Sequence, residues 1–193
     1  MSNFPNQKQR KSVCMAWGKF NPPTVEHQVL AKNLVAIAKS RNAVPVIFMD
    51  KEFNAENPLL FSEKLSWIHV LYPDISPYFN TNVNVVDPVA AAISLAKSGF
   101  TDLIIVGGAD TVQHTKAEVL SANGNTGKYK FVSVTAVATG PKDPDNSETF
   151  VSAAELKQAA LDGNIQKFRR GLPDTASDEE INKLMQTIKA RAK

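Results

Sequence analysis

One segment, from Val13 to His27, combines the residue types and spacing that an anion-binding site needs; it reads VCMAWGKFNPPTVEH. An apolar run ends at Gly18, two prolines follow, and Thr24 stands where its hydroxyl can cap a helix. The first turn of that helix would present free amides and a positive dipole end to an anion. His27, three residues after the cap, could donate a hydrogen bond to a phosphate oxygen. The same spacing also fits a solvated histidine on an amphipathic helix.

A second candidate is Asp110, which follows Gly107 and Gly108 at the end of the apolar run 103–106. Its carboxylate could face a ligand, or it could cap the next helix. Asp50, directly after another apolar run, is a weaker candidate of the same kind. His69 and His114 have no second His or Cys at ligand spacing, so we predict no metal site held by the protein alone.

The elements that must position these residues alternate between short apolar runs and helical patterns. Strands are expected at 13–17, 44–49, 83–86, 103–106 and 131–137, and helices at 26–39, 62–71 and 89–97. This order predicts an α/β fold with a doubly wound parallel sheet. A ligand of such a sheet lies beyond the carboxyl ends of its strands.

The last third of the chain has no strand signal. Two capping boxes, Ser152 with Glu155 and Ser177 with Glu180, predict two or three helices, with breaks at Gly163 and at 171–173. We therefore expect a flexible tail over 1–11, one domain over 12–173 and a C-terminal helix over 174–193. Residues 140–149 are expected to form a loop.

Composition limits the class of protein. With 193 residues, 43% of them hydrophobic, the chain is neither disordered nor fibrous. A net charge of +3 gives no reason to expect a nucleic-acid partner. The single cysteine, Cys14, cannot form an intrachain disulfide and lies in an apolar run, which indicates a buried thiol and a cytoplasmic protein. The sequence shows no membrane span and no signal-peptide core.

The segment GKFNPPTVEH resembles the signature of the cytidylyltransferase-like nucleotidyltransferases, in particular a phage nucleotidyltransferase-like group that starts Gly-Arg-Phe-Asn-Pro-Pro-Thr-x-Gly-His. Further segments fit that group in the same order: Asn57-Pro58-Leu59 with Lys64 and Tyr72-Pro73, then 106–110, 142–145, 152–157, and Phe168 with 171–173. Several weak matches in one order indicate a Rossmann-like fold of this type with a helical C-terminal extension.

The resemblance implies transfer of a nucleoside monophosphate from ATP or CTP, as a Mg²⁺ complex, to a small phosphorylated or hydroxylated acceptor, with release of pyrophosphate. Thr24, His27 and Lys157 would be the catalytic residues. The nucleotide would be held by Gly18, Lys19, Asn21, Gly107, Gly108, Asp110 and Ser152.

The chain departs from that signature at positions that would contact the triphosphate. Glu26 replaces the motif glycine, Ala154 replaces a hydroxyl residue, and Lys157 replaces an arginine. Glu26 adds bulk and negative charge where a triphosphate would lie, and Lys157 cannot form a bidentate contact. The alternative is therefore a non-catalytic structural or assembly component, such as a phage virion protein or a homo-oligomer. A dinucleotide-binding oxidoreductase would need a Gly-x-Gly-x-x-Gly turn that the first strand lacks.

Overall fold

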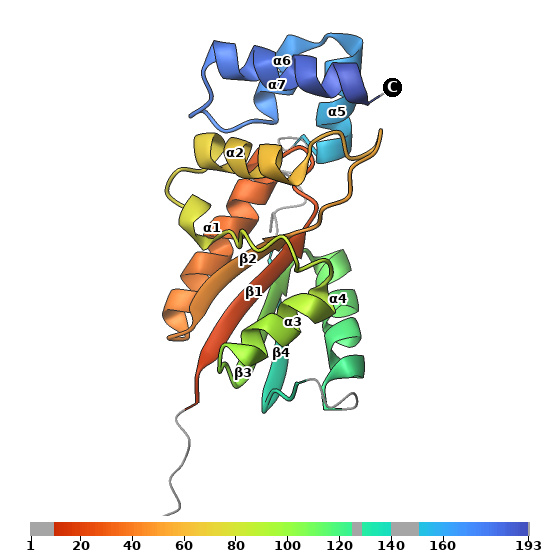
Figure 1. The fold of residues 1–193 in the computed structure, drawn as a ribbon. Helices are drawn as coiled ribbons and strands as arrows, with labels where there is room; N and C mark the ends of the chain where they lie inside the picture. Colours follow the sequence, from red (N-terminus) through yellow and green to blue (C-terminus); the bar gives the residue numbers. More distant parts are fainter. Residues whose placement is uncertain (1–9, 125–128, 140–150, 193) are drawn as a thin grey trace, which may run out of the picture.

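A computed structural model of the chain describes residues 10–124, 129–139 and 151–192 (Figure 1). Four parallel strands form one sheet in the order β2-β1-β3-β4. The strands are β1 (Ser12–Gly18), β2 (Val44–Met49), β3 (Asp102–Gly107) and β4 (Ser133–Ala138). The predicted α/β fold with a parallel sheet is confirmed, and the four strands lie within two residues of the predicted ranges at each end.

Helices cover both faces of the sheet. They are α1 (Val25–Ser40), α2 (Phe61–Leu71), the 3₁₀ turn η1 (Ser76–Tyr78), α3 (Pro88–Lys97), α4 (Ala109–Ala122), α5 (Ala153–Asp162), α6 (Ile165–Arg170) and α7 (Asp178–Arg191). Successive side chains of a strand point to opposite faces. Cys14 and Ala16 accordingly join the apolar cluster under α1 and α2, whereas Val13 and Met15 join the cluster under α3 and α4.

The strand expected at 83–86 is wrong. This stretch is irregular, and Val83 and Val86 are 62% and 60% exposed. Asparagine side chains capture backbone amides here: Asn80 Oδ1 accepts from the amide of Asn82, and Asn82 Oδ1 from that of Asn84, both at 2.9 Å. These local turns compete with strand pairing, which the apolar residues alone did not reveal.

The C-terminal helices lie beyond α2 at one end of the molecule (Figure 1). Ile181, Leu184 and Ile188 of α7 belong to the same buried cluster as Leu34 of α1 and Ile68 of α2. Both predicted capping boxes are present, and Gly163 ends α5 with a φ of 72°. The prediction of two or three helices after residue 152 is confirmed.

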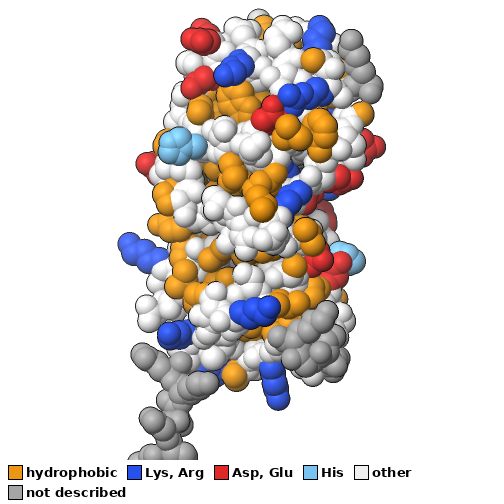
Figure 2. All heavy atoms as spheres, in the orientation of Figure 1, with side chains coloured by type: hydrophobic (Ala, Val, Ile, Leu, Met, Phe, Trp, Pro, Cys, Tyr) orange, Lys and Arg blue, Asp and Glu red, His pale blue; other side chains and the backbone are white. Residues whose placement is uncertain are grey.

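Two predicted segments lie partly or wholly outside the described residues: the loop 140–149, and residues 1–9 of the tail. Arg10, at the end of that tail, forms an ion pair with Asp102 at the start of β3. Within the described ranges, none of the helices combines the length and the apolar character needed to cross a bilayer. Charged side chains of both signs are interspersed with apolar ones on the face seen in Figure 2.

Candidate functional site

A cleft of about 770 Å³ lies at the carboxyl ends of β1, β2 and β3, beside the starts of α1 and α4. This is the position where parallel sheets of this class bind ligands. Among the residues that line it are five of the predicted site residues, namely Gly18, Lys19, His27, Gly108 and Asp110. Trp17, which stacks on Phe48 with ring centroids 6.5 Å apart, also lines the cleft.

Thr24 and His27 form a reciprocal cap at the start of α1. The Thr24 hydroxyl accepts from the His27 amide at 3.3 Å, and the Thr24 amide donates to Nδ1 of His27 at 3.2 Å. Because Nδ1 accepts this bond, the proton of the neutral imidazole resides on Nε2. The predicted N-cap role of Thr24 is confirmed, and its side chain is fully buried.

The environment of His27 favours its neutral form. The imidazole is half-buried and lies against the ring of Phe20, with centroids 4.7 Å apart. Burial lowers the pKa of His27 to about 4, because the imidazolium would lose hydration there. At neutral pH the residue therefore offers an uncharged N–H donor.

The anion-binding capacity of α1 is partly used by the chain itself. The Val25 amide donates to the Gly171 carbonyl at 2.9 Å, and the His27 amide is taken by Thr24. Glu26 lines the cleft from the same turn. The first turn of α1 thus presents the carboxylate of Glu26 beside the backbone amide of the same residue.

The start of α4 is more open. Gly108 is its N-cap and makes no side-chain cap, so the alternative role of Asp110 as N-cap is wrong; Asp110 lies in the first turn. Gly107 ends β3, where an added Cβ would lie 3.3 Å from Cβ of Val112. This close packing brings the first turn of α4 against the end of the sheet.

The cleft is rich in carboxylates. Glu26, Asp50, Asp110 and Glu118 all line it. Lys19, the single lysine among the described residues that line it, is paired with Glu52 at 3.3 Å. Across the described ranges, no three His, Cys, Asp or Glu side chains form a group that could hold a metal. Mg²⁺ commonly binds through substrate phosphates and one or two carboxylates, so a Mg²⁺ carried by a nucleotide fits this lining better than a resident ion.

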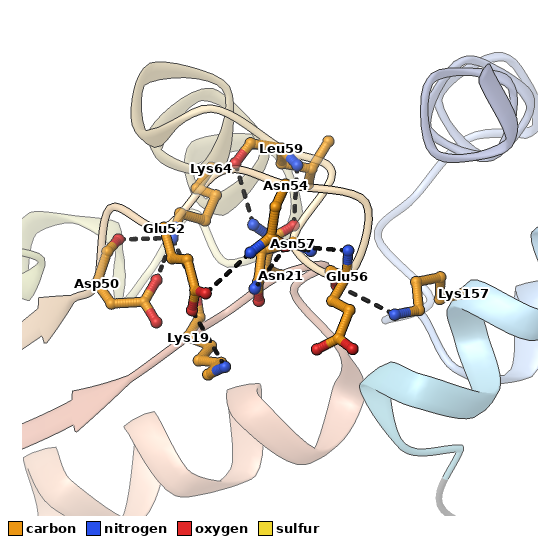
Figure 3. Close-up of polar contacts among 10 residues, drawn as sticks. All are labelled: Lys19, Asn21, Asp50, Glu52, Asn54, Glu56, Asn57, Leu59, Lys64 and Lys157. Atoms are coloured by element: carbon orange, nitrogen blue, oxygen red, sulfur yellow. Dashed lines mark hydrogen bonds and ion pairs between the residues drawn. The ribbon is translucent and has the colours of Figure 1, made fainter. Parts of the chain in front are cut away.

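Three predicted site residues lie apart from the described lining of the cleft, besides the buried Thr24 and Gly107. Asn21 is buried and exchanges two 3.0 Å hydrogen bonds with the backbone of Leu59. Ser152 caps α5 and bonds the carboxylate of Glu155. Lys157 donates to the carbonyl of Glu56 at 3.2 Å (Figure 3). Asn21 and Lys157 thus both form hydrogen bonds with the backbone of the loop that follows β2.

The sequence reasoning did not assign two residues that line the cleft from α4, His114 and Glu118. The signal was present, since Asp110, His114 and Glu118 recur every four residues and therefore share one helix face. His114 Nε2 lies 3.5 Å from Glu118 Oε1. Nothing in the sequence indicated that His114 binds a metal, and the structure places it on the wall of the cleft.

No protein-family model matches the sequence, and no curated protein matches it. A crystal structure of Thermotoga maritima TmcAL bound with alpha-thio ATP aligns with 93% of this chain and 56% of that chain, at 11% identity and a TM-score of 0.46. This chain therefore spans little more than half the length of that protein. A likeness of this degree carries no argument about function, and the family resemblance stays a prediction from the sequence.

Proposed function

We propose that the cleft binds a nucleoside triphosphate, ATP or CTP, as its Mg²⁺ complex and transfers the nucleoside monophosphate to a small acceptor. The observation that supports this best is His27: a neutral imidazole, oriented by Thr24, at a helix start on the wall of a cleft at the carboxyl ends of the strands. A neutral donor of fixed orientation can stabilise charge that develops on a phosphate without reorganising during the reaction.

Different residues of the chain would bind different parts of the nucleotide. Nε2 of His27, the ring nitrogen that Thr24 does not engage, would donate to a phosphate oxygen. The uncapped first turn of α4 at Gly108 would receive a second phosphate group, and Lys19 would contribute a positive charge. The bound Mg²⁺ would neutralise phosphate charge and polarise the phosphoryl group. Asp110, which lines the cleft, would contact that ion or its water shell.

Binding is tested by thermal denaturation with ATP and CTP, each with and without Mg²⁺. We expect the melting temperature to rise only when Mg²⁺ is present, because the carboxylates of the cleft repel a free triphosphate. Pyrophosphate release with candidate acceptors then tests transfer. No rise with either nucleotide would contradict the proposal.

His27→Ala should abolish pyrophosphate release while the protein stays folded. His69→Ala is the matched control, because His69 is exposed on α2 and does not line the cleft. Unchanged release in His27→Ala would show that His27 has no catalytic role.

A second candidate, a non-catalytic structural component, is favoured by two observations. Glu26 lines the cleft, and Lys157 bonds the backbone of Glu56 instead of lining it. The two candidates differ in solution: a structural component would purify as a large stoichiometric assembly and would show no nucleotide-dependent rise in melting temperature.

A further inference from the structure

Lys64 of α2 is a fully buried lysine whose side chain ends beside the cleft. Its Nζ lies 3.0 Å from the Lys19 carbonyl, 2.6 Å from the Asp50 carbonyl and 3.0 Å from Oδ1 of Asp50 (Figure 3). An ammonium has three N–H donors, and here each has an acceptor. Both acceptor residues line the cleft.

Burying a charged side chain costs free energy, because the charge loses its hydration. Burial lowers the pKa of Lys64, and the hydrogen bond and charge of Asp50 oppose that shift. A buried ion pair can often be replaced by apolar side chains of similar volume with no loss of stability. Stability alone therefore does not account for the pair of Lys64 and Asp50, and the acceptors of Lys64 indicate a further role: they belong to the turns that follow β1 and β2.

The contact with Lys19 acts on the backbone at a strained point. The Lys19 carbonyl belongs to the peptide that leads into Phe20, a non-glycine residue in the left-handed region with a φ of 48°. That conformation is unfavourable for a residue with a side chain and persists only where the surroundings impose it. The hydrogen bond from Lys64 holds the preceding carbonyl and so helps to maintain it.

The conformation of Phe20 brings its ring against two residues of the site, Gly18 and His27. A Cβ added to Gly18 would lie 2.8 Å from Cε2 of Phe20, and the ring also contacts the imidazole of His27, with centroids 4.7 Å apart. The ring is buried and contributes to the shielding of His27 from water. A chain of direct contacts therefore runs from Lys64 through the 19–20 peptide and the Phe20 ring to His27.

We infer that Lys64 is a positioning residue of the cleft: by holding the Lys19 carbonyl and the Asp50 carboxylate, it fixes Phe20 and through it the packed, shielded environment of the His27 ring that Thr24 orients. The contacts of Lys64 do not depend on a bound ligand, whereas the effect of Lys64 on catalysis rests on the proposed function. Lys64 does not itself line the cleft.

The test uses Lys64→Met, which keeps much of the volume, and Lys64→Arg, which keeps the charge but cannot direct three donors from one atom. Asp102→Asn is the matched control, because Asp102 is also a buried charged residue in an ion pair but lies at the opposite, amino end of β3. The readout is NMR of the His27 imidazole in the ligand-free protein, which contains three histidines.

In the parent protein and in Asp102→Asn, His27 should titrate near pH 4 with the same ring signals. In either Lys64 variant we expect these signals to move and the pKa of His27 to rise towards its ordinary value, because the Phe20 ring no longer shields it. Binding of Mg·ATP should weaken by about tenfold, whereas Asp102→Asn should bind as the parent does.

Folded Lys64 variants with unchanged His27 signals and titration would overturn the inference. If neither Lys64 variant folds while Asp102→Asn does, Lys64 serves global stability and the inference is equally overturned. A parent protein that does not bind Mg·ATP contradicts the proposed function only, since the ligand-free titration still decides the role of Lys64.

Discussion

Among the residues that the structure describes, one charged side chain is buried at each end of the sheet, and the two ends satisfy it differently. At the amino end, the carboxylate of Asp102 accepts hydrogen bonds from the side chains of Arg10, Thr101 and Ser133. At the carboxyl end, the ammonium of Lys64 donates to two backbone carbonyls and one carboxylate oxygen. The first network joins side chains at the starts of strands, whereas the second holds the backbone of turns.

This difference separates a structural network from one that shapes a site. The partner of Asp102, Arg10, keeps 60% of its side chain exposed, so it can be hydrated if the pair is broken. The partner of Lys64, Asp50, has a side chain only 14% exposed, and it lines the cleft. Loss of Lys64 therefore leaves a shielded charge and two released turns, and loss of Asp102 leaves neither.

The largest expected effect is on stability at the carboxyl end. Lys64→Met should lower the free energy of unfolding by about 3 kcal/mol, because it leaves the Asp50 carboxylate, whose side chain is only 14% exposed, without its counter-ion. Urea denaturation measures this, and Asp50→Asn introduced together with Lys64→Met should recover part of the loss. No recovery in the double variant would show that the charge of Asp50 is not the cause.

Acid should weaken the carboxyl end before the amino end. The pKa of His27 is depressed to about 4, so the unfolded chain takes up a proton first as the pH falls from about 6.5. Stability due to neutral His27 is complete above that range and is lost as the pH falls towards 4, by up to about 3 kcal/mol. Unfolding free energies measured between pH 7 and 4 should lose this slope in His27→Gln.

The amino end should respond at lower pH. The hydrogen bond and charge of Arg10 hold the pKa of Asp102 at about 2, so its contribution is present above about pH 4 and is lost as the pH falls to 2. Asp102→Asn should remove that slope and cost about 2 kcal/mol at pH 7. An acid transition in Asp102→Asn identical to that of the parent would contradict this assignment.

The smallest effect concerns the charge of the cleft. Glu26→Gln should tighten binding of Mg·ATP by a few-fold, since an exposed charge near a ligand contributes on the order of 1 kcal/mol. Glu179→Gln is the matched control: both glutamates are the second residue of their helices, and Glu179 is exposed on α7, away from the cleft. Equal affinities of both variants and the parent would show that Glu26 does not oppose the nucleotide.

Residue patterns predicted those parts of the fold that depend on local chemistry. The apolar runs of β1–β4, the caps at Thr24, Ser152 and Ser177 and the break at Gly163 were all predicted from neighbours in the sequence. The prediction of a strand at 83–86 was wrong for a local reason as well. The asparagines that form the turns lie within this segment or a few residues before it in the sequence. The valines favour a strand, but hydrogen bonds from backbone amides to the side chains of Asn80 and Asn82 stabilise turns in its place.

The sequence by itself determined the four strands that form, the capped starts of α1, α5 and α7, and the position of a ligand site at the carboxyl ends of the strands. Only the tertiary structure decided which polar residues meet there: it joined Lys64 to Lys19 and Asp50, placed Glu118 on the wall, and directed Lys157 to the carbonyl of Glu56. Caps and strand patterns involve residues a few positions apart. The partners of a buried charge are set by how distant segments pack, and no local pattern records that.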